Sequence, residues 1–165
     1  MRGINFGSRW LWWLLVGATA SWLLGMTLRP HRNYNPDQLN LIPMSEHSEA
    51  LTCLINDTCF SPRRALWFLL IDVVGNVIVF VPLGLGLAGV LHQTNLRQTI
   101  RLAALGGFGL SLLIELSQLV IPSRTTDVDD LIFNTLGASI GAVIFALLWR
   151  AGGSKLAGRK AAGDT

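Results

Sequence analysis

Charged residues are scarce in this chain of 165 residues, where Asp, Glu, Lys and Arg together make up only 14%. About 25% is usual for a soluble globular protein. Hydrophobic residues make up 51%, which excludes a disordered chain, because disorder needs low hydrophobicity and high net charge. The two cysteines are too few for a small protein held together by disulfides. The 13 basic and 10 acidic residues leave a net charge of only +3, so no strongly basic surface indicates a nucleic-acid partner.

Four apolar segments are each long enough to cross a membrane as a helix, which takes about 20 residues. We place them at residues 10–28, 66–91, 102–121 and 131–149. Only helices and closed barrels satisfy the backbone in lipid, and these segments lack the alternation of apolar and polar residues that barrel strands require. The sequence therefore predicts an all-α membrane protein, a bundle of four transmembrane helices.

The first apolar segment could instead be a cleaved signal peptide, because Ala18-Thr19-Ala20 resembles a cleavage site. The apolar stretch continues beyond this point to Met26, however. We therefore favour a transmembrane helix, with cleavage as the alternative.

The basic residues of the loops predict that both termini lie in the cytoplasm, since cytoplasmic loops carry an excess of Lys and Arg. In this orientation eight basic residues lie inside: Arg2, Arg9, Arg97, Arg101, Arg150, Lys155, Arg159 and Lys160. Five lie outside: Arg29, Arg32, Arg63, Arg64 and Arg124. Residues 1–9 and 150–165 are then cytoplasmic, the latter as a disordered basic tail, and residues 29–65 form an extracytoplasmic loop.

This long loop contains both cysteines, Cys53 and Cys59, with five residues between them. An oxidising compartment would allow them to form a disulfide, and a pair of free thiols is the alternative. The three histidines, His31, His47 and His92, show no metal-ligand spacing. We therefore interpret them as solvent-exposed side chains.

Polar side chains interrupt the last three apolar segments at spacings of three or four residues, which puts them on one face of each helix. In chain order they are Asp72 and Asn76; Ser111, Glu115 and Gln118; and Asp127, Asp130 and Asn134. At about 1.5 Å of rise per residue, Asp72 lies about 10 Å and Glu115 about 9 Å below the outer surface. Ionisable groups inside a membrane cost about 2.5 to 3.5 kcal/mol each, so they normally mark function or a specific packing need. The pattern predicts a polar pocket in the outer half of the membrane, with polar contacts that only hold the helices together as the alternative.

Further expectations concern single acids near this layer. A buried Glu115 needs a proton or a nearby cation, and Arg124 is the nearest candidate in the sequence. Asp127 and Asp130 also suit the N-terminus of the last helix, where acidic groups interact favourably with the helix dipole. Asp129 lies between them on another face, so we interpret it as a solvent-exposed acid.

Proline and glycine suggest how the helices pack. Pro82 removes a hydrogen bond to the carbonyl of Ile78, so we expect a kink in the second transmembrane helix. Gly137 and Gly141 form a face of small residues that permits close approach of another helix.

Three motifs follow one another through residues 66–149. They are N-x3-F-x-P-x-G from Asn76, E-x2-Q from Glu115 and R-x2-D-x2-D-x3-N-x2-G from Arg124. In this order and spacing they resemble the VanZ-like family of membrane proteins, whereas the first helix and the long loop are similar only in layout. The resemblance implies a multi-pass protein of the bacterial plasma membrane. The residues that it implies to matter are Asn76, Glu115, Gln118, Arg124, Asp127, Asp130 and Asn134.

The name-giving member of that family is associated with low-level teicoplanin resistance, and no settled biochemical activity comes with the resemblance. We expect the polar pocket to recognise or modify a cell-envelope lipid or a glycopeptide-related ligand. The candidate catalytic residues are Glu115, Asp127 and Asp130, which would handle protons, directly or with a divalent cation. The candidate ligand-binding residues are Asp72, Asn76, Gln118, Arg124 and Asn134, with Arg124 suited to a phosphate or carboxylate.

No nucleophile is evident in the sequence, so whether the protein is an enzyme stays open. A non-catalytic scaffold, or a small binding or transport subunit, is the alternative. Membrane lipids are the expected partners, and an envelope lipid-linked ligand and a second copy of the chain are partners left open. The sequence names no cofactor and leaves metal binding undetermined.

Overall fold

The computed structural model of this protein describes residues 9–30, 39–92, 95–121 and 123–163, with side chains described as far as residue 151 at the C-terminal end. The described chain is α-helical apart from one short pair of strands. Four helical segments are long and apolar enough to cross a membrane. They are α1 (Arg9–Thr27), the combined segment Pro62–Val90, α5 (Leu96–Gln118) and the part Val128–Ala151 of α6 (Val128–Gly163). The predicted all-α fold with four long apolar helices is confirmed.

The helix boundaries lie close to the predicted ones except at α5, which begins at Leu96 rather than at residue 102. The side chain of Asn95 accepts a hydrogen bond of 3.0 Å from the backbone N–H of Arg97 and so caps this helix. An N-cap of this kind satisfies a backbone donor that the first turn leaves unpaired. The helix therefore starts at its cap, in a polar turn before the apolar stretch begins.

The second membrane-spanning segment is not one regular helix. It consists of α3 (Pro62–Leu69), a π-helical turn η1 (Leu70–Val74) and α4 (Gly75–Val90). The sequence analysis predicted irregularity at Pro82, which lies inside α4, but it did not predict the π turn. Asp72 lies within that turn, and π turns inside helices occur frequently at functional sites.

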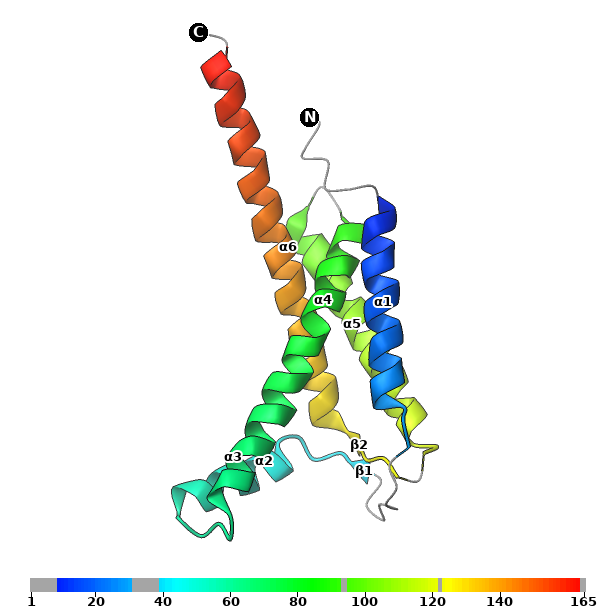
Figure 1. The fold of residues 1–165 in the computed structure, drawn as a ribbon, viewed down its shortest axis with the longest axis vertical. Coiled ribbons are helices and arrows are strands. Elements are labelled where there is room, and N and C mark those ends of the chain that lie inside the picture. Colours follow the sequence, from blue (N-terminus) through cyan, green and yellow to red (C-terminus); the bar gives the residue numbers. More distant parts are fainter. Residues whose placement is uncertain (1–8, 31–38, 93–94, 122, 164–165) are drawn as a thin grey trace.

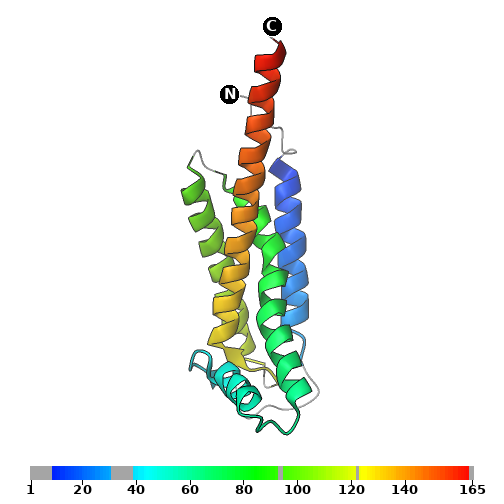
Figure 2. The ribbon, with the colours of Figure 1, turned by 90° about the vertical axis from the view of Figure 1, so that its left-hand side faces the viewer.

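Helix α4 lies at the centre of the bundle, in contact with α1, α5 and α6 (Figures 1 and 2). Its approach to α6 is close because small residues face its backbone. A Cβ atom built on Gly137 would lie 2.2 Å from the Val77 carbonyl oxygen, and one on Gly141 would lie 2.1 Å from the Val81 carbonyl oxygen. The predicted close approach at Gly137 and Gly141 is thus confirmed.

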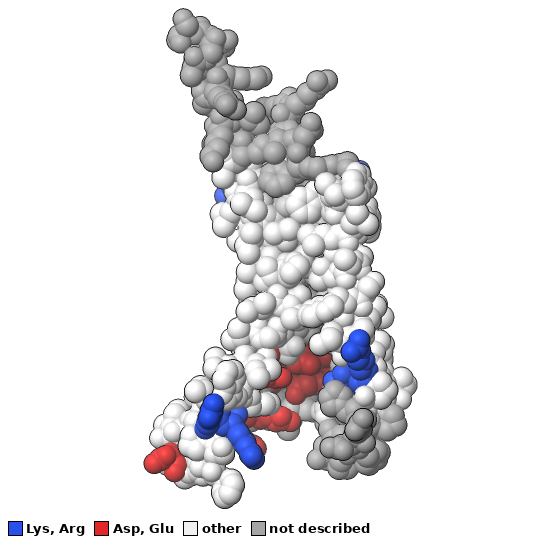
Figure 3. All heavy atoms as spheres, viewed as in Figure 1, with Lys and Arg blue, Asp and Glu red and all other residues white. Residues whose placement is uncertain are grey.

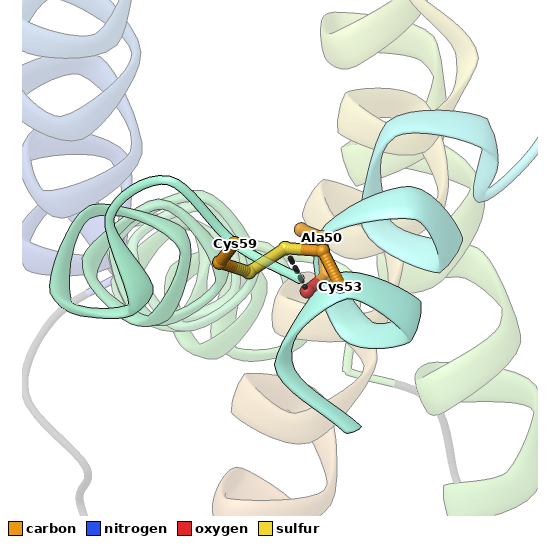
Figure 4. The surroundings of a disulfide bond; sticks show 3 residues. All are labelled: Ala50, Cys53 and Cys59. Carbon is orange, nitrogen blue, oxygen red and sulfur yellow. Dashed lines mark hydrogen bonds between the residues drawn. A yellow bond between two sulfur atoms is a disulfide. The ribbon is translucent and has the colours of Figure 1, made fainter. Parts of the chain in front are cut away.

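The predicted loop 29–65 contains ordered structure at the end of the bundle opposite to Arg9 (Figure 1). Strand β1 (Leu39–Asn40) pairs in parallel with β2 (Thr126–Asp127), which directly precedes α6. Helix α2 (Ser45–Ile55) follows, and a disulfide joins Cys53 in its last turns to Cys59 in the connection to α3 (Figure 4). The strand pair and α2 together cover the N-terminus of α6.

The C-terminal segment differs from the expected disordered tail, because α6 continues as a helix to Gly163 (Figure 1). A helix that is already nucleated adds each further residue at little cost. Residues 151–163 contain four alanines and no proline, so no residue among them ends the helix outright, although their four glycines weaken it. The expectation of disorder was therefore wrong for the described part of this segment.

Candidate functional site

Glu115, near the end of α5, is hydrogen-bonded to strand β2, which leads into α6. Its side chain is buried, with 4% of the residue exposed. Its carboxylate oxygen Oε2 accepts a hydrogen bond of 2.9 Å from the backbone N–H of Asp127. The hydroxyl of Thr126 donates to the Glu115 backbone carbonyl at 3.1 Å. The Glu115 carboxylate therefore points toward the acidic start of α6.

The start of α6 is organised by Asp127. One carboxylate oxygen accepts a hydrogen bond of 2.8 Å from the backbone N–H of Asp129, and the other accepts one of 3.0 Å from the side-chain amide of Asn40. Asp127 thus caps the helix, as the sequence analysis predicted for this position. One turn on, Asp130 accepts a hydrogen bond from the side-chain amide of Asn76 on α4. This contact joins the motif that begins at Asn76 to the motif that begins at Arg124.

Asp129 is not a solvent-exposed acid, and the interpretation of it as one was wrong. It is fully buried, at 0% exposure. Both of its carboxylate oxygens accept the backbone N–H of Met44, at 2.8 and 2.9 Å. Oδ2 also lies 3.0 Å from Nδ1 of His47. The reason is tertiary: α2 folds back over the start of α6 and covers a face that would otherwise meet water.

His47 was also wrongly interpreted as solvent-exposed, since only 4% of the residue is exposed. While Nδ1 contacts Asp129, its other ring nitrogen, Nε2, lies 3.0 Å from Oδ2 of Asp72 on the π turn. The imidazole packs between Phe68 and Phe133, with ring centroids 5.3 and 5.4 Å away. His47 therefore joins α2 to both η1 and α6, and no spacing in the sequence indicates this role.

The other histidines lie away from this group. His92 is partly buried rather than fully solvent-exposed, with its ring centroid 4.1 Å from that of Trp149. Burial lowers the pKa of the His92 imidazole below its usual range. His31 lies outside the described residues.

Arg124 does not pair with Glu115, so that candidate pairing was wrong. Its guanidinium donates from Nε to the Arg29 carbonyl and from Nη2 to the Met26 carbonyl, each at 3.0 Å. The last carbonyls of a helix lack partners within the helix, and the end of α1 presents such carbonyls to Arg124. Gln118 acts nearby, where its amide donates to the Thr27 carbonyl at 3.3 Å. Both side chains thus hold the end of α1.

Asn134 lies one turn further along α6 than Asp130 and is also buried. Its side-chain amide forms a hydrogen bond of 3.0 Å with the hydroxyl of Ser111 on α5. The eight predicted catalytic and ligand-binding residues therefore do gather at one end of the bundle. Asn76 and Asp130 contact each other across two helices, whereas Arg124 and Gln118 donate hydrogen bonds to backbone carbonyls at the end of α1.

Acidic side chains are visible in a recess at the lower end of the bundle (Figure 3), and basic side chains lie at its edge. At this end of the bundle, Asp130 interacts electrostatically with Asp72, Glu115 and Asp127. We give the name acidic hollow to this group of four interacting carboxyl groups and the space beside them. Within it, 32% of the Asp72 side chain is exposed.

An apolar groove of about 420 Å³ lies between α1 and α4. Its lining residues are Ala18, Thr19, Trp22, Ile78, Val79 and Pro82. Trp22 precedes Met26 by one helical turn, and Ile78 follows Asn76 by two residues. The groove therefore lies at a level along α1 and α4 within about two helical turns of Met26 and Asn76.

A family model described as VanZ/LLP1 matches residues 9–149 of the chain. The protein belongs to the VanZ/LLP1 family. The match confirms the resemblance and extends it over the first transmembrane helix and the long loop. No curated protein and no solved structure matches this VanZ/LLP1 chain.

The acidic hollow of this VanZ/LLP1 protein extends toward the extramembrane helix α2. Burial raises the pKa of the Glu46 carboxyl above its usual range, and the charges of Asp127 and Asp72 raise it further. The acids are nevertheless not arranged as a metal site, because the described residues include no group of three or more His, Cys, Asp or Glu that could hold an ion. The described geometry gives no support to the option of a divalent cation between Asp127 and Asp130.

Two buried oxygens of the VanZ/LLP1 protein lack a hydrogen-bond partner on the same face of α5. They are Oε1 of Glu115 and Oε1 of Gln118, in residues that are 4% and 5% exposed. The Gln118 oxygen is assigned unambiguously, because its amide nitrogen donates to a carbonyl that can only accept. Buried polar atoms are nearly always paired, so these two oxygens mark positions where a donor is missing.

Proposed function

We propose that this VanZ/LLP1 protein recognises the head group of an amphiphilic molecule of the cell envelope in the outer half of the membrane. Two observations carry the proposal: acidic side chains are visible in a recess at one end of the bundle (Figure 3), and an apolar groove lies between α1 and α4. A lipid or lipid-linked ligand has a polar head and an apolar chain, which match these two surfaces. Small-molecule sites are usually concave and mostly apolar, with a few polar groups that fix orientation.

The two termini of the membrane-spanning region lie in the cytoplasm under this proposal, and the acidic hollow faces the outer leaflet of a bacterial plasma membrane. The disulfide between Cys53 and Cys59 supports this orientation, because disulfides persist in oxidising compartments. It is at the same end of the molecule as the acidic hollow. The excess of basic residues at the opposite end supports the same orientation.

Within the acidic hollow, the proposed roles differ from residue to residue. Both carboxylate oxygens of Asp127 already accept hydrogen bonds from Asp129 and Asn40. Glu115 keeps one oxygen without a partner. We therefore assign ligand contact first to Glu115, and the movement of a proton, if the ligand is modified, to Glu115 and Asp130. Arg124 serves to position α1, which forms one wall of the groove.

Lipid retention by the purified protein tests this function. The protein is extracted in mild detergent, incubated with total envelope lipid, and examined by native mass spectrometry. We expect one retained amphiphile in the wild type and its loss in Ala18→Trp, which fills the groove. Leu147→Trp is the control, because Leu147 is exposed on α6 away from the groove. Equal retention in both variants would overturn the proposal.

The alternative function is that of a scaffold in which polar groups only hold the helices together. The contacts of Arg124 and Gln118 with the backbone of α1 favour this alternative. Membrane abundance of Glu115→Ala and Asp127→Ala separates the two functions. A scaffold predicts that both variants disappear from the membrane, whereas a recognition site predicts that Glu115→Ala remains abundant and no longer retains the amphiphile.

A further inference from the structure

We infer that the head group carries a primary ammonium, so that the ligand is an amine-bearing amphiphile whose nitrogen enters the acidic hollow beside Glu115. This inference rests on the proposed function and specifies its ligand. Three separate features of the described residues support it: the balance of charge, the unpaired oxygens and the place of the basic side chains.

Carboxyl groups outnumber basic groups in and around the acidic hollow. Its carboxylates and their neighbours on α2 and α6 are Glu46, Asp72, Glu115, Asp127, Asp129 and Asp130. Among the described residues, the basic side chain in contact with them is His47, which lies between Asp72 and Asp129. A phosphate or carboxylate placed here would meet several like charges at short range, which is unfavourable. A cation would reduce the repulsion among the acids.

The unpaired oxygens point to a hydrogen-bond donor, independently of the charge. Glu115 is more than nine-tenths buried, its Oε2 is held by the Asp127 backbone, and its Oε1 has no partner. Gln118 presents a second unpaired acceptor three residues further along the same face of α5. An ammonium group has three donors and no acceptor, which complements such a site.

The basic side chains lie where they could contact the rest of such a ligand. Arg124 lies at the end of α1, where two of its N–H groups are bound to carbonyls, and basic side chains are visible at the edge of the acidic recess (Figure 3). A zwitterionic lipid would place its amine in the hollow, its phosphate near these basic side chains and an acyl chain along the groove.

Four lipids with identical acyl chains test the inference on the full-length wild-type protein in detergent, with thermal stabilisation as the readout. Phosphatidylethanolamine should stabilise the protein most. Phosphatidylglycerol has no amine, phosphatidylcholine has a cation without N–H donors, and N-acetylated phosphatidylethanolamine has lost the charge. We expect each of these three to bind at least about tenfold more weakly, the difference that a hydrogen bond to a charged group makes. Free ethanolamine should not stabilise the protein, because it lacks the chain that the groove receives.

Glu115→Gln should reduce the affinity for phosphatidylethanolamine by about tenfold or more. Glu49→Gln on the exposed face of α2 is the matched control and should leave the affinity unchanged. Equal stabilisation by all the lipids, as expected if water alone fills the hollow, would overturn the inference. A preference for phosphatidylglycerol would also overturn it while leaving the proposed function intact. Stabilisation by none of them, together with no retained envelope amphiphile, would contradict both.

Discussion

At the scale of single residues, the acids that the sequence analysis selected lie together because helical spacing determines which side chains share a face. Asp72, Glu115 and Asp130 could be selected from spacing alone. Asp129 and His47 could not, because their contact depends on α2 folding back over α6. For the same reason the sequence suggested the wrong partner for Arg124, whose carbonyl acceptors belong to a helix 95 or more residues earlier in the chain.

The contact of His47 with two carboxylates leads to the first prediction. His47→Leu would remove the imidazole that contacts the buried carboxylate of Asp129. Removing one partner of a buried hydrogen bond costs about 1–3 kcal/mol and more when the remaining group is charged, so we expect a correspondingly lower free energy of unfolding. Denaturant unfolding of the purified protein measures the change. The double variant His47→Leu/Asp129→Asn should recover part of the loss, and an equal loss in the single and double variants would show that the contact with Asp129 is not its cause.

A second prediction concerns pH, through Glu46 on α2. The pKa of Glu46 is raised in the folded protein from its ordinary value of 4.5, so the folded state holds this proton more tightly than the unfolded state. Stability should therefore decrease as pH rises from the unfolded pKa through the folded pKa of this group. The effect should be small, because Glu46 is largely exposed and water screens its charge.

Glu46→Gln removes this titration and tests its sign. At pH 7 the variant should melt at a slightly higher temperature than the wild type, and near pH 4 the two should be similar. Asp57→Asn is the control, because Asp57 is an exposed acid that is not among the charges acting on Glu46, and it should not reproduce the difference. A lower melting temperature of Glu46→Gln at pH 7 would contradict the assigned direction of the pKa shift.

At the scale of elements, the sequence analysis located the four apolar helices well and their irregularities poorly. Length and composition determine where an apolar helix can cross a membrane. The π turn at Leu70–Val74 has the same apolar composition as the regular helix around it, so hydrophobic pattern could not reveal it. The close contact of α6 with another helix was easier to predict than the π turn. Gly137 and Gly141 have no side chain that would keep a partner helix away, whichever helix that is.

A third prediction uses the contact between α4 and α6. A Cβ atom on Gly84 would lie 1.9 Å from the backbone oxygen of Ala138, so Gly84→Ala forces the two helices apart. Overpacking of this kind costs about 1–3 kcal/mol, measurable as a lower melting temperature. Gly109→Ala on α5 is the control, because nothing lies within 4 Å of its added Cβ. If both variants melted alike, backbone contact would not be what holds α4 against α6.

At the scale of the whole molecule, the four apolar helices divide the protein into two chemically different ends. Arg9 and the far end of α6 lie at one end, while the strand pair, the disulfide and the acidic hollow lie at the other (Figure 1). Basic loop residues could suggest an orientation from the sequence with a margin of only eight to five. The position of the disulfide adds an argument that depends on compartment chemistry instead of loop charge.

The last prediction tests this orientation in intact cells with a membrane-impermeant maleimide. Arg63→Cys on α3 and Arg97→Cys on α5 place single exposed thiols at opposite ends of the molecule. The native cysteines are joined in a disulfide and should not react. If the acidic hollow faces the outside, Arg63→Cys should be labelled in intact cells and Arg97→Cys only after the membrane is permeabilised. The reverse pattern would place the hollow in the inner leaflet, and the ligand would then have to be sought among cytoplasmic amphiphiles.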